Sequence, residues 1–88
     1  MVKWRIVLSR AAAKDGKKLR DAGLQFRAET LLKILKDNPF QTPPSYEKLV
    51  GNLKGFYSRR INIKHRLVYS VDQKQRVVHI LRMWTHYE

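Results

Sequence analysis

The sequence predicts an α+β protein: a strand, two helices and then a three-stranded antiparallel meander, with the helices packed on one face of a four-stranded twisted sheet. Three observations lead to this fold class. Hydrophobicity alternates near the start of the chain, apolar residues recur at helical spacing over residues 10–37, and strand-like runs separated by short turns fill residues 55–84. The 88 residues suffice for a single domain, 1–88, with one modest core.

The first strand and helix are predicted from alternation and capping. Residues 3–8 alternate as a half-buried strand does, with the apolar face formed by Trp4, Ile6 and Leu8. Ser9 is a favourable N-cap for a helix that ends at about Ala22. Gly23 follows, and glycine readily ends a helix in the left-handed conformation.

A second helix follows, with one apolar stripe. The stripe is formed by Leu24, Ala28, Leu31, Leu32 and Leu35. Asn38 and Pro39 should end this helix, because proline cannot continue it. Residues 40–46 then form an irregular connector rather than a domain boundary, since too little chain lies on either side for two cores.

Three consecutive strands are predicted in the second half. They cover residues 56–61, 66–71 and 77–84, with turns at 62–65 and 72–75. Short connections require an antiparallel meander. The last strand is apolar on both faces, so it should be central and covered. The first strand should pair with one of these three.

Composition limits the compartment and the class of protein. The chain is 43% hydrophobic and 30% charged, which is too apolar for a disordered tail. No apolar run reaches the ~20 residues that cross a bilayer, and no secretion signal is apparent. Cysteine is absent. These features predict a cytoplasmic protein without a membrane partner.

The charge indicates a polyanionic partner. The chain has nineteen Lys and Arg but only seven Asp and Glu, which gives a formal net charge of +12 and a pI near 10.5. Such a field attracts polyanions such as nucleic acid, the ribosome, anionic lipid or an acidic protein. The helical region carries a basic face that is either simply solvated or in contact with such a partner: Lys14, Lys17, Lys18, Arg20 and Arg27.

The polar residues of the second half suggest an anion site. Glu47 is a rare acid in this cationic chain, and an isolated carboxylate of this kind often forms a structural ion pair. Arg59 and Arg60 must face opposite sides of their strand, whereas Arg66 shares a face with Val68. A guanidinium on a half-buried face needs an anion, either a protein carboxylate or a ligand phosphate. The residues alone leave both alternatives open.

The three histidines do not form a recognisable zinc spacing, so no metal or other cofactor is predicted. His79 lies within the apolar last strand and is expected to be packed or partnered. His86 stands near the chain's end, tethered two residues away by Trp84.

One arrangement of residues is more specific. Glu47 is followed by Leu-Lys-Gly-Phe-Tyr-Ser-Arg-Arg-Ile at 53–61, by His-Arg-Leu-Val-Tyr at 65–69 and by the pair His86–Tyr87. This order resembles the YoeB/Txe family of toxins from type II toxin–antitoxin systems, within the RelE/ParE superfamily. The resemblance runs over nearly the whole chain. It implies a RelE/ParE-like fold.

The resemblance also implies an activity and a site. The family enters the ribosomal A site and cleaves mRNA there, which inhibits translation. By this resemblance Glu47 is the general base, Arg66 stabilises the phosphate, His86 is the general acid and Tyr87 positions the substrate or shares the proton transfer. Contacts to RNA phosphates are expected from Lys54, Arg59, Arg60 and His65.

The expected partners are mRNA with the ribosome, and a cognate acidic antitoxin of the YefM/Axe kind encoded next to this gene. A homodimer of the free toxin is left open. Two other functions compete with the endoribonuclease: a toxin of the same fold that acts on DNA gyrase, and a non-catalytic basic module that binds RNA or protein.

Overall fold

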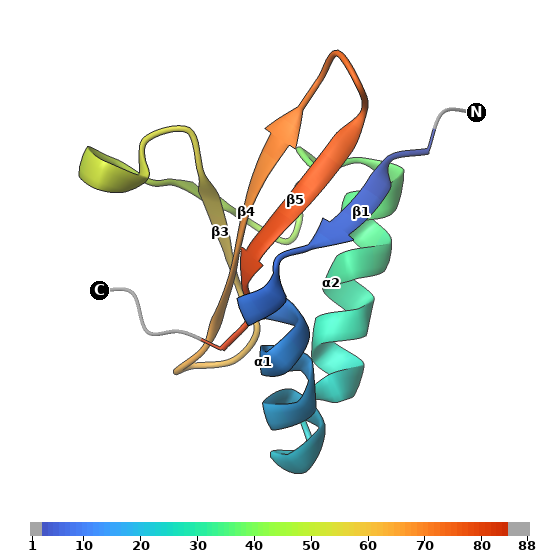
Figure 1. Cartoon of the computed structure of the whole chain (residues 1–88), viewed down its shortest axis with the longest axis vertical. Helices are drawn as coiled ribbons and strands as arrows, with labels where there is room; N and C mark the ends of the chain where they lie inside the picture. The colour runs from blue at the N-terminus through green and yellow to red at the C-terminus, as the bar shows by residue number, and fades with distance from the viewer. Residues whose placement is uncertain (1–2, 85–88) are drawn as a thin grey trace.

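The structure is a computed structural model that describes residues 3–84. Figure 1 shows two helices side by side on one side of a sheet, with a short 3-10 turn projecting on the other side of the molecule. The elements, in chain order, are β1 (Arg5–Leu8), α1 (Arg10–Asp21), α2 (Gln25–Asp37), β2 (Glu47–Lys48), η1 (Gly51–Leu53), β3 (Tyr57–Arg60), β4 (Arg66–Asp72) and β5 (Val77–Arg82).

The described strands form one sheet in the order β1-β5-β4-β3-β2. β3, β4 and β5 are the predicted antiparallel meander, and β1 pairs with β5 in parallel, from Arg5 opposite Val77 to Leu8 opposite Ile80. The α+β class and the topology are confirmed, but the sheet has five strands where four were expected. The additional strand is β2, which pairs Glu47 with Ser58 and Lys48 with Tyr57. Two residues are too few to show the alternation by which a strand is predicted.

The helix boundaries follow the predicted signals. The amide of Ala12 donates to Ser9 Oγ at 3.0 Å, so Ser9 is the N-cap of α1. The Ser9 hydroxyl also donates to the carbonyl of Leu81 at 2.7 Å, which ties the start of α1 to β5. Gly23 has a φ of 74°, as predicted for the residue after the first helix. α2 has its C-cap at Asn38.

The core lies between the helices and one face of the sheet. α2 buries Ala28, Leu31 and Leu35 of its predicted stripe, and α1 buries Ala12, Asp15 and Leu19. The residues of this core are Ala12, Leu19, Ala28, Leu31, Leu35, Ile61, Leu67, Tyr69, Val78, Ile80 and Met83. Ile6 of β1 and Trp4, just before that strand, pack against it, but Leu8 of the same predicted face is 43% exposed.

β5 differs from the prediction in two respects. It is an interior strand, as expected, but it ends at Arg82 rather than at residue 84. His79 was expected to be packed or partnered; it is exposed, so the packed alternative is wrong. His79 lies beside Val7 of β1 and Ser70 of β4, and with them it lines a hollow on the sheet. The apolar pattern of the strand did not reveal that this side of β5 is open.

Over the described part of the chain, no helix is both long enough and apolar enough to span a bilayer.

Candidate active site

The sheet register brings together Glu47 and Arg66, two of the four residues expected to be catalytic. Arg66 Nη1 donates to Glu47 Oε1 at 3.1 Å and lies 3.3 Å from Ser58 Oγ. Glu47 is opposite Ser58 on β3, and Ser58 is opposite Val68 on β4. Arg66 is two residues from Val68, on the same face of its strand, so its side chain reaches back across β3 to β2.

This ion pair is open to solvent at its carboxylate. The side chain of Glu47 is 64% exposed, whereas that of Arg66 is 15% exposed. Solvent screens the pair at its carboxylate end, so we expect it to contribute only about 1 kcal/mol to stability. The contact is the protein-carboxylate alternative left open by the sequence.

A second cation stands next to Arg66. Arg60 is its direct cross-strand neighbour and is exposed. Like charges directly opposite each other in a sheet repel. The repulsion is relieved when an anion lies between or beside the two guanidinium groups, and in the structure the carboxylate of Glu47 lies beside Arg66.

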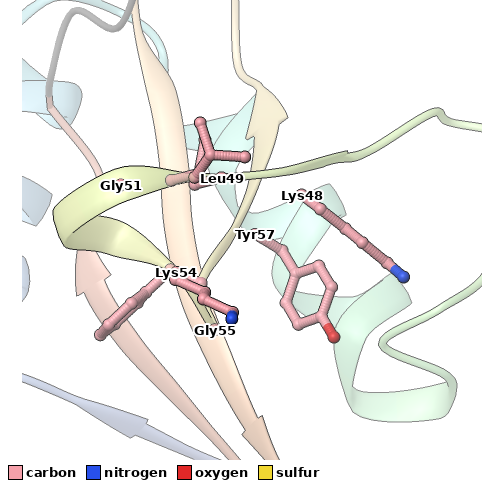
Figure 2. A pocket seen from close by; sticks show the side chains of 8 residues that line it. Lys48, Leu49, Gly51, Lys54, Gly55 and Tyr57 are labelled. Carbon is pink, nitrogen blue, oxygen red and sulfur yellow. The ribbon is translucent and has the colours of Figure 1, made fainter.

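A hollow of about 520 Å³ lies beside β2, between that strand, η1 and β3. Figure 2 shows Lys48, Lys54 and Tyr57 at this hollow, with Lys48 and Tyr57 on paired positions of β2 and β3. The remaining lining residues are Leu49, Val50, Gly51, Gly55 and Phe56. Lys54, one of the predicted phosphate contacts, is thus exposed at a concave surface that a second lysine also borders.

Arg59 does not have the predicted position at an RNA-binding surface. It is 1% exposed, and its donors are used within the protein. Nε donates to Tyr69 Oη at 3.0 Å, Nη1 to the carbonyl of Pro44 at 2.7 Å, and Nη2 to the carbonyls of Pro39 and Gln41 at 3.0 and 2.9 Å. This burial does not favour the predicted phosphate contact. Arg59 instead holds the connector between α2 and β2 against the sheet.

The surroundings of Arg59 are aromatic. Its guanidinium carbon lies 5.0 Å from the ring centroid of Tyr46, and Tyr57 stacks on Tyr69 at 5.6 Å. Burial raises the pKa of the Tyr69 phenol, and this effect outweighs the opposing effect of Arg59. The hydroxyl thus stays protonated and donates to the carbonyl of Pro39 at 3.1 Å.

Replacing Arg59 with Met should destabilise the fold. The substitution removes the Arg59 donors from four buried or part-buried oxygens, of which the Pro39 carbonyl still accepts a hydrogen bond from Tyr69. Breaking a buried network of this kind costs about 3–5 kcal/mol. For a domain of this size we expect Tm to fall by at least about 12 °C in a thermal melt followed by circular dichroism. Arg60→Met is the matched control on the exposed neighbour and should change Tm by little. Equal melting of both variants would contradict the structural role of Arg59.

His65 is also buried, so its predicted contact with RNA phosphate is not supported. Its ring stacks on that of Trp84, with centroids 3.8 Å apart and planes 21° from parallel. The amide of His65 donates to Asn62 Oδ1 at 2.7 Å, within the turn that joins β3 and β4. The stack ties Trp84 to the residue that precedes Arg66.

His86 and Tyr87, the other two expected catalytic residues, lie outside the described residues. The structure shows instead what holds the chain just before them. Asp15 of α1, 1% exposed, accepts hydrogen bonds from Arg82 Nε at 2.8 Å and Arg82 Nη2 at 3.1 Å. It also accepts from the amides of Met83 at 3.0 Å and Trp84 at 3.2 Å. Sequence reasoning missed Asp15, although an acid between Ala12 and Leu19 on a buried helix stripe is a recognisable signal.

The Asp15 carboxylate is stabilised in its charged form. Burial raises its pKa, but the hydrogen bonds and charge of Arg82 and the two amide hydrogen bonds together lower it by more. The pKa therefore lies below its ordinary value, and Asp15 remains ionised at neutral pH.

Among residues 3–84, no group of three or more His, Cys, Asp or Glu side chains is placed to hold a metal ion.

Comparison with solved structures defines the class of protein. A structure described as a YoeB/ParE toxin from Agrobacterium tumefaciens superposes with a TM-score of 0.85 at 27% identity, covering 94% of this chain and 99% of the other. A chain of a YoeB–YefM complex from Staphylococcus aureus gives a TM-score of 0.80 at 36% identity, covering 96% of this chain and 98% of the other. The fold is therefore that of the RelE/ParE toxins.

The family follows from the sequence match. A model described as the YoeB-like toxin of bacterial type II toxin–antitoxin systems matches residues 17–87. The toxin YoeB of Synechocystis sp. is 37% identical over 68 residues, which is 77% of each chain. The chain belongs to the family of YoeB-like toxins.

Proposed function

We propose that this toxin is a ribosome-dependent mRNA endoribonuclease that inhibits translation and is neutralised by its cognate antitoxin. The observation that carries the proposal is the exposed carboxylate of Glu47 at 3.1 Å from the guanidinium of Arg66. A base and a phosphate-binding cation in contact are two of the three groups that metal-independent RNA cleavage needs.

In the proposed reaction, a phosphate of mRNA takes the place of Glu47 at Arg66. The released carboxylate then accepts the proton of the neighbouring 2′-hydroxyl, whose oxygen attacks the phosphorus. Arg66 stabilises the charge that develops on the pentacoordinate phosphate. His86 donates a proton to the departing 5′-oxygen, and Tyr87 positions the phosphate or nucleobase. The weak, exposed ion pair supports this exchange, because little free energy opposes it.

The surroundings favour RNA as the substrate. Arg60 flanks Arg66, while Lys48 and Lys54 border the hollow at β2, whose volume lies in the range of about 300–1,000 Å³ of small-ligand pockets. Glu47 and Lys48 are consecutive on β2 and so face opposite sides. The RNA chain would therefore pass around this edge strand, with a phosphate at Arg66 and a neighbouring nucleotide in the hollow.

The antitoxin is the proposed regulatory partner. The net charge of +12 favours an acidic protein, and the related S. aureus toxin has been solved as a YoeB–YefM complex. A dimer of a related S. aureus YoeB has also been solved, which supports the homodimer as a second proposed assembly of the free toxin.

The proposal is tested by adding the purified toxin to a translation extract programmed with a defined mRNA. We expect cleavage within the codon in the A site, mapped by primer extension, and no comparable cleavage of the same mRNA without ribosomes. Equal cutting of free RNA would contradict ribosome dependence. Salt-sensitive RNA binding without any cut would favour the binding module, and DNA damage signalling in cells without translation arrest would favour a gyrase toxin.

A further inference from the structure

The end of β5 contacts the side chain of a buried acid on α1. Three consecutive residues, Arg82, Met83 and Trp84, donate four hydrogen bonds to the carboxylate of Asp15. β5 ends at Arg82, so the amides of Met83 and Trp84 have left the ladder and need other acceptors. A buried carboxylate on α1 supplies them. We refer to this contact as the Asp15 clamp.

The clamp lies close to the candidate active site. Arg82 is opposite Val68 on β4, and Val68 is two residues from Arg66. At the clamp's other end, Trp84 stacks on His65, the residue before Arg66. The clamp thus holds the backbone of residues 82–84 beside the strand that carries the phosphate-binding cation.

We propose that Asp15 is a positioning residue for the general acid His86. This inference rests on the proposed endoribonuclease activity, in which His86 protonates the leaving oxygen. Asp15 does not touch the substrate; it acts by fixing the point from which the last residues of the chain start.

Chain geometry shows how much the loss of the Asp15 clamp would enlarge the volume open to the general acid. An extended chain spans at most about 3.6 Å per residue, so the link from a fixed Trp84 to residue 86 can reach about 7 Å. Without the clamp, the nearest preceding residue held in the sheet is Arg82, which pairs with Val68 of β4, and the link from there to residue 86 can reach about 14 Å. The volume open to the acid grows by about 8-fold. One aromatic stack on His65 does not compensate for two amides that lose their acceptor.

A double-mutant cycle tests the inference. Single-turnover cleavage of ribosome-bound mRNA is measured for wild type, Asp15→Asn, His86→Ala and the double variant. We expect Asp15→Asn to lower the rate about tenfold in the wild-type background, with KM unchanged, and less than twofold in the His86→Ala background, where no acid remains to be positioned. The same loss in both backgrounds, or no loss in either, would overturn the proposal.

Controls separate positioning from folding. Asp21→Asn changes an exposed acid at the end of the same helix and should leave the rate unchanged. Arg82→Lys keeps the positive charge but loses the two-pronged contact with Asp15. It replaces Asp15→Asn in the cycle if that variant fails to fold.

A second measurement does not depend on RNA cleavage. In {¹H}-¹⁵N heteronuclear NOE spectra, the clamp predicts lower values for the amides of residues 85–88 in Asp15→Asn than in wild type. Unchanged values would overturn the clamp's role even if the wild-type protein cut no RNA. A wild-type protein that shows the predicted NOE difference but no cleavage would instead refute the proposed function.

Discussion

Replacing Glu47 with Gln is expected to slow cleavage of ribosome-bound mRNA by about 10²–10⁴-fold, the usual contribution of a general base. Glutamine keeps the size of the side chain but cannot accept the proton of the 2′-hydroxyl. The loss should appear in the single-turnover rate rather than in binding, because Arg66 and Arg60 still attract the phosphate. Stability should change by no more than about 1 kcal/mol, since the ion pair with Arg66 is exposed at Glu47.

Glu29→Gln is the matched control for this experiment. Glu29 is an exposed glutamate on α2, away from the residues assigned to the site. We expect it to cleave at the wild-type rate. Cleavage by Glu47→Gln at the wild-type rate would leave the Glu47–Arg66 contact as a structural ion pair only.

Replacing His86 with Ala is expected to cause a loss of similar size, about 10²–10⁴-fold. The 5′-oxygen of the leaving nucleotide is a poor leaving group without a proton donor. The loss should shrink strongly on an mRNA whose scissile 5′-oxygen is replaced by sulfur, because a thiolate leaves without protonation. Both substrates are compared in the same ribosome-bound cleavage assay.

His79→Ala provides the control for loss of a histidine. His79 is exposed on β5 and has no assigned role in the reaction, so this variant should match wild type on both substrates. An equal loss for His86→Ala on the oxygen and the sulfur substrate would contradict the assignment of His86 as the acid.

Much of the fold could be predicted because its signals are local. Ser9 caps α1 and Gly23 follows the helix, as their conformational preferences require. The helix stripes and the meander follow from periodicity and short turns. β2 could not be predicted in this way, because its two residues are a strand only through their pairing with β3.

The site was predictable in part. Residue chemistry led to an anion site and left open whether Arg66 meets a protein carboxylate or a phosphate; in the structure it contacts Glu47. Alternation correctly predicted that Arg59 and Arg60 face opposite sides. It could not show which of them is buried, because that depends on carbonyl groups of the connector 39–44, distant in sequence.

The role of Asp15 could not be predicted either, because it also depends on contacts between residues distant in sequence. Its partners are 67 to 69 residues further along the chain, so no local pattern connects them. The burial of His65 also depends on a distant contact: its neighbour Arg66 contacts Glu47, but the ring of His65 stacks on Trp84. In both cases the deciding contact is made by the end of β5, whose path the sequence alone does not specify.

Attack by the 2′-hydroxyl on mRNA in the ribosome is the central claim, and one substrate tests it most directly. The mRNA carries a single 2′-deoxynucleotide at the position where the wild-type toxin cuts, and it is compared on programmed ribosomes with the all-ribose mRNA. We expect no cleavage at the deoxy position, while a deoxynucleotide one codon away leaves cleavage intact. Cleavage of the deoxy linkage at the all-ribose rate would contradict both the mechanism and the role of Glu47 as its base.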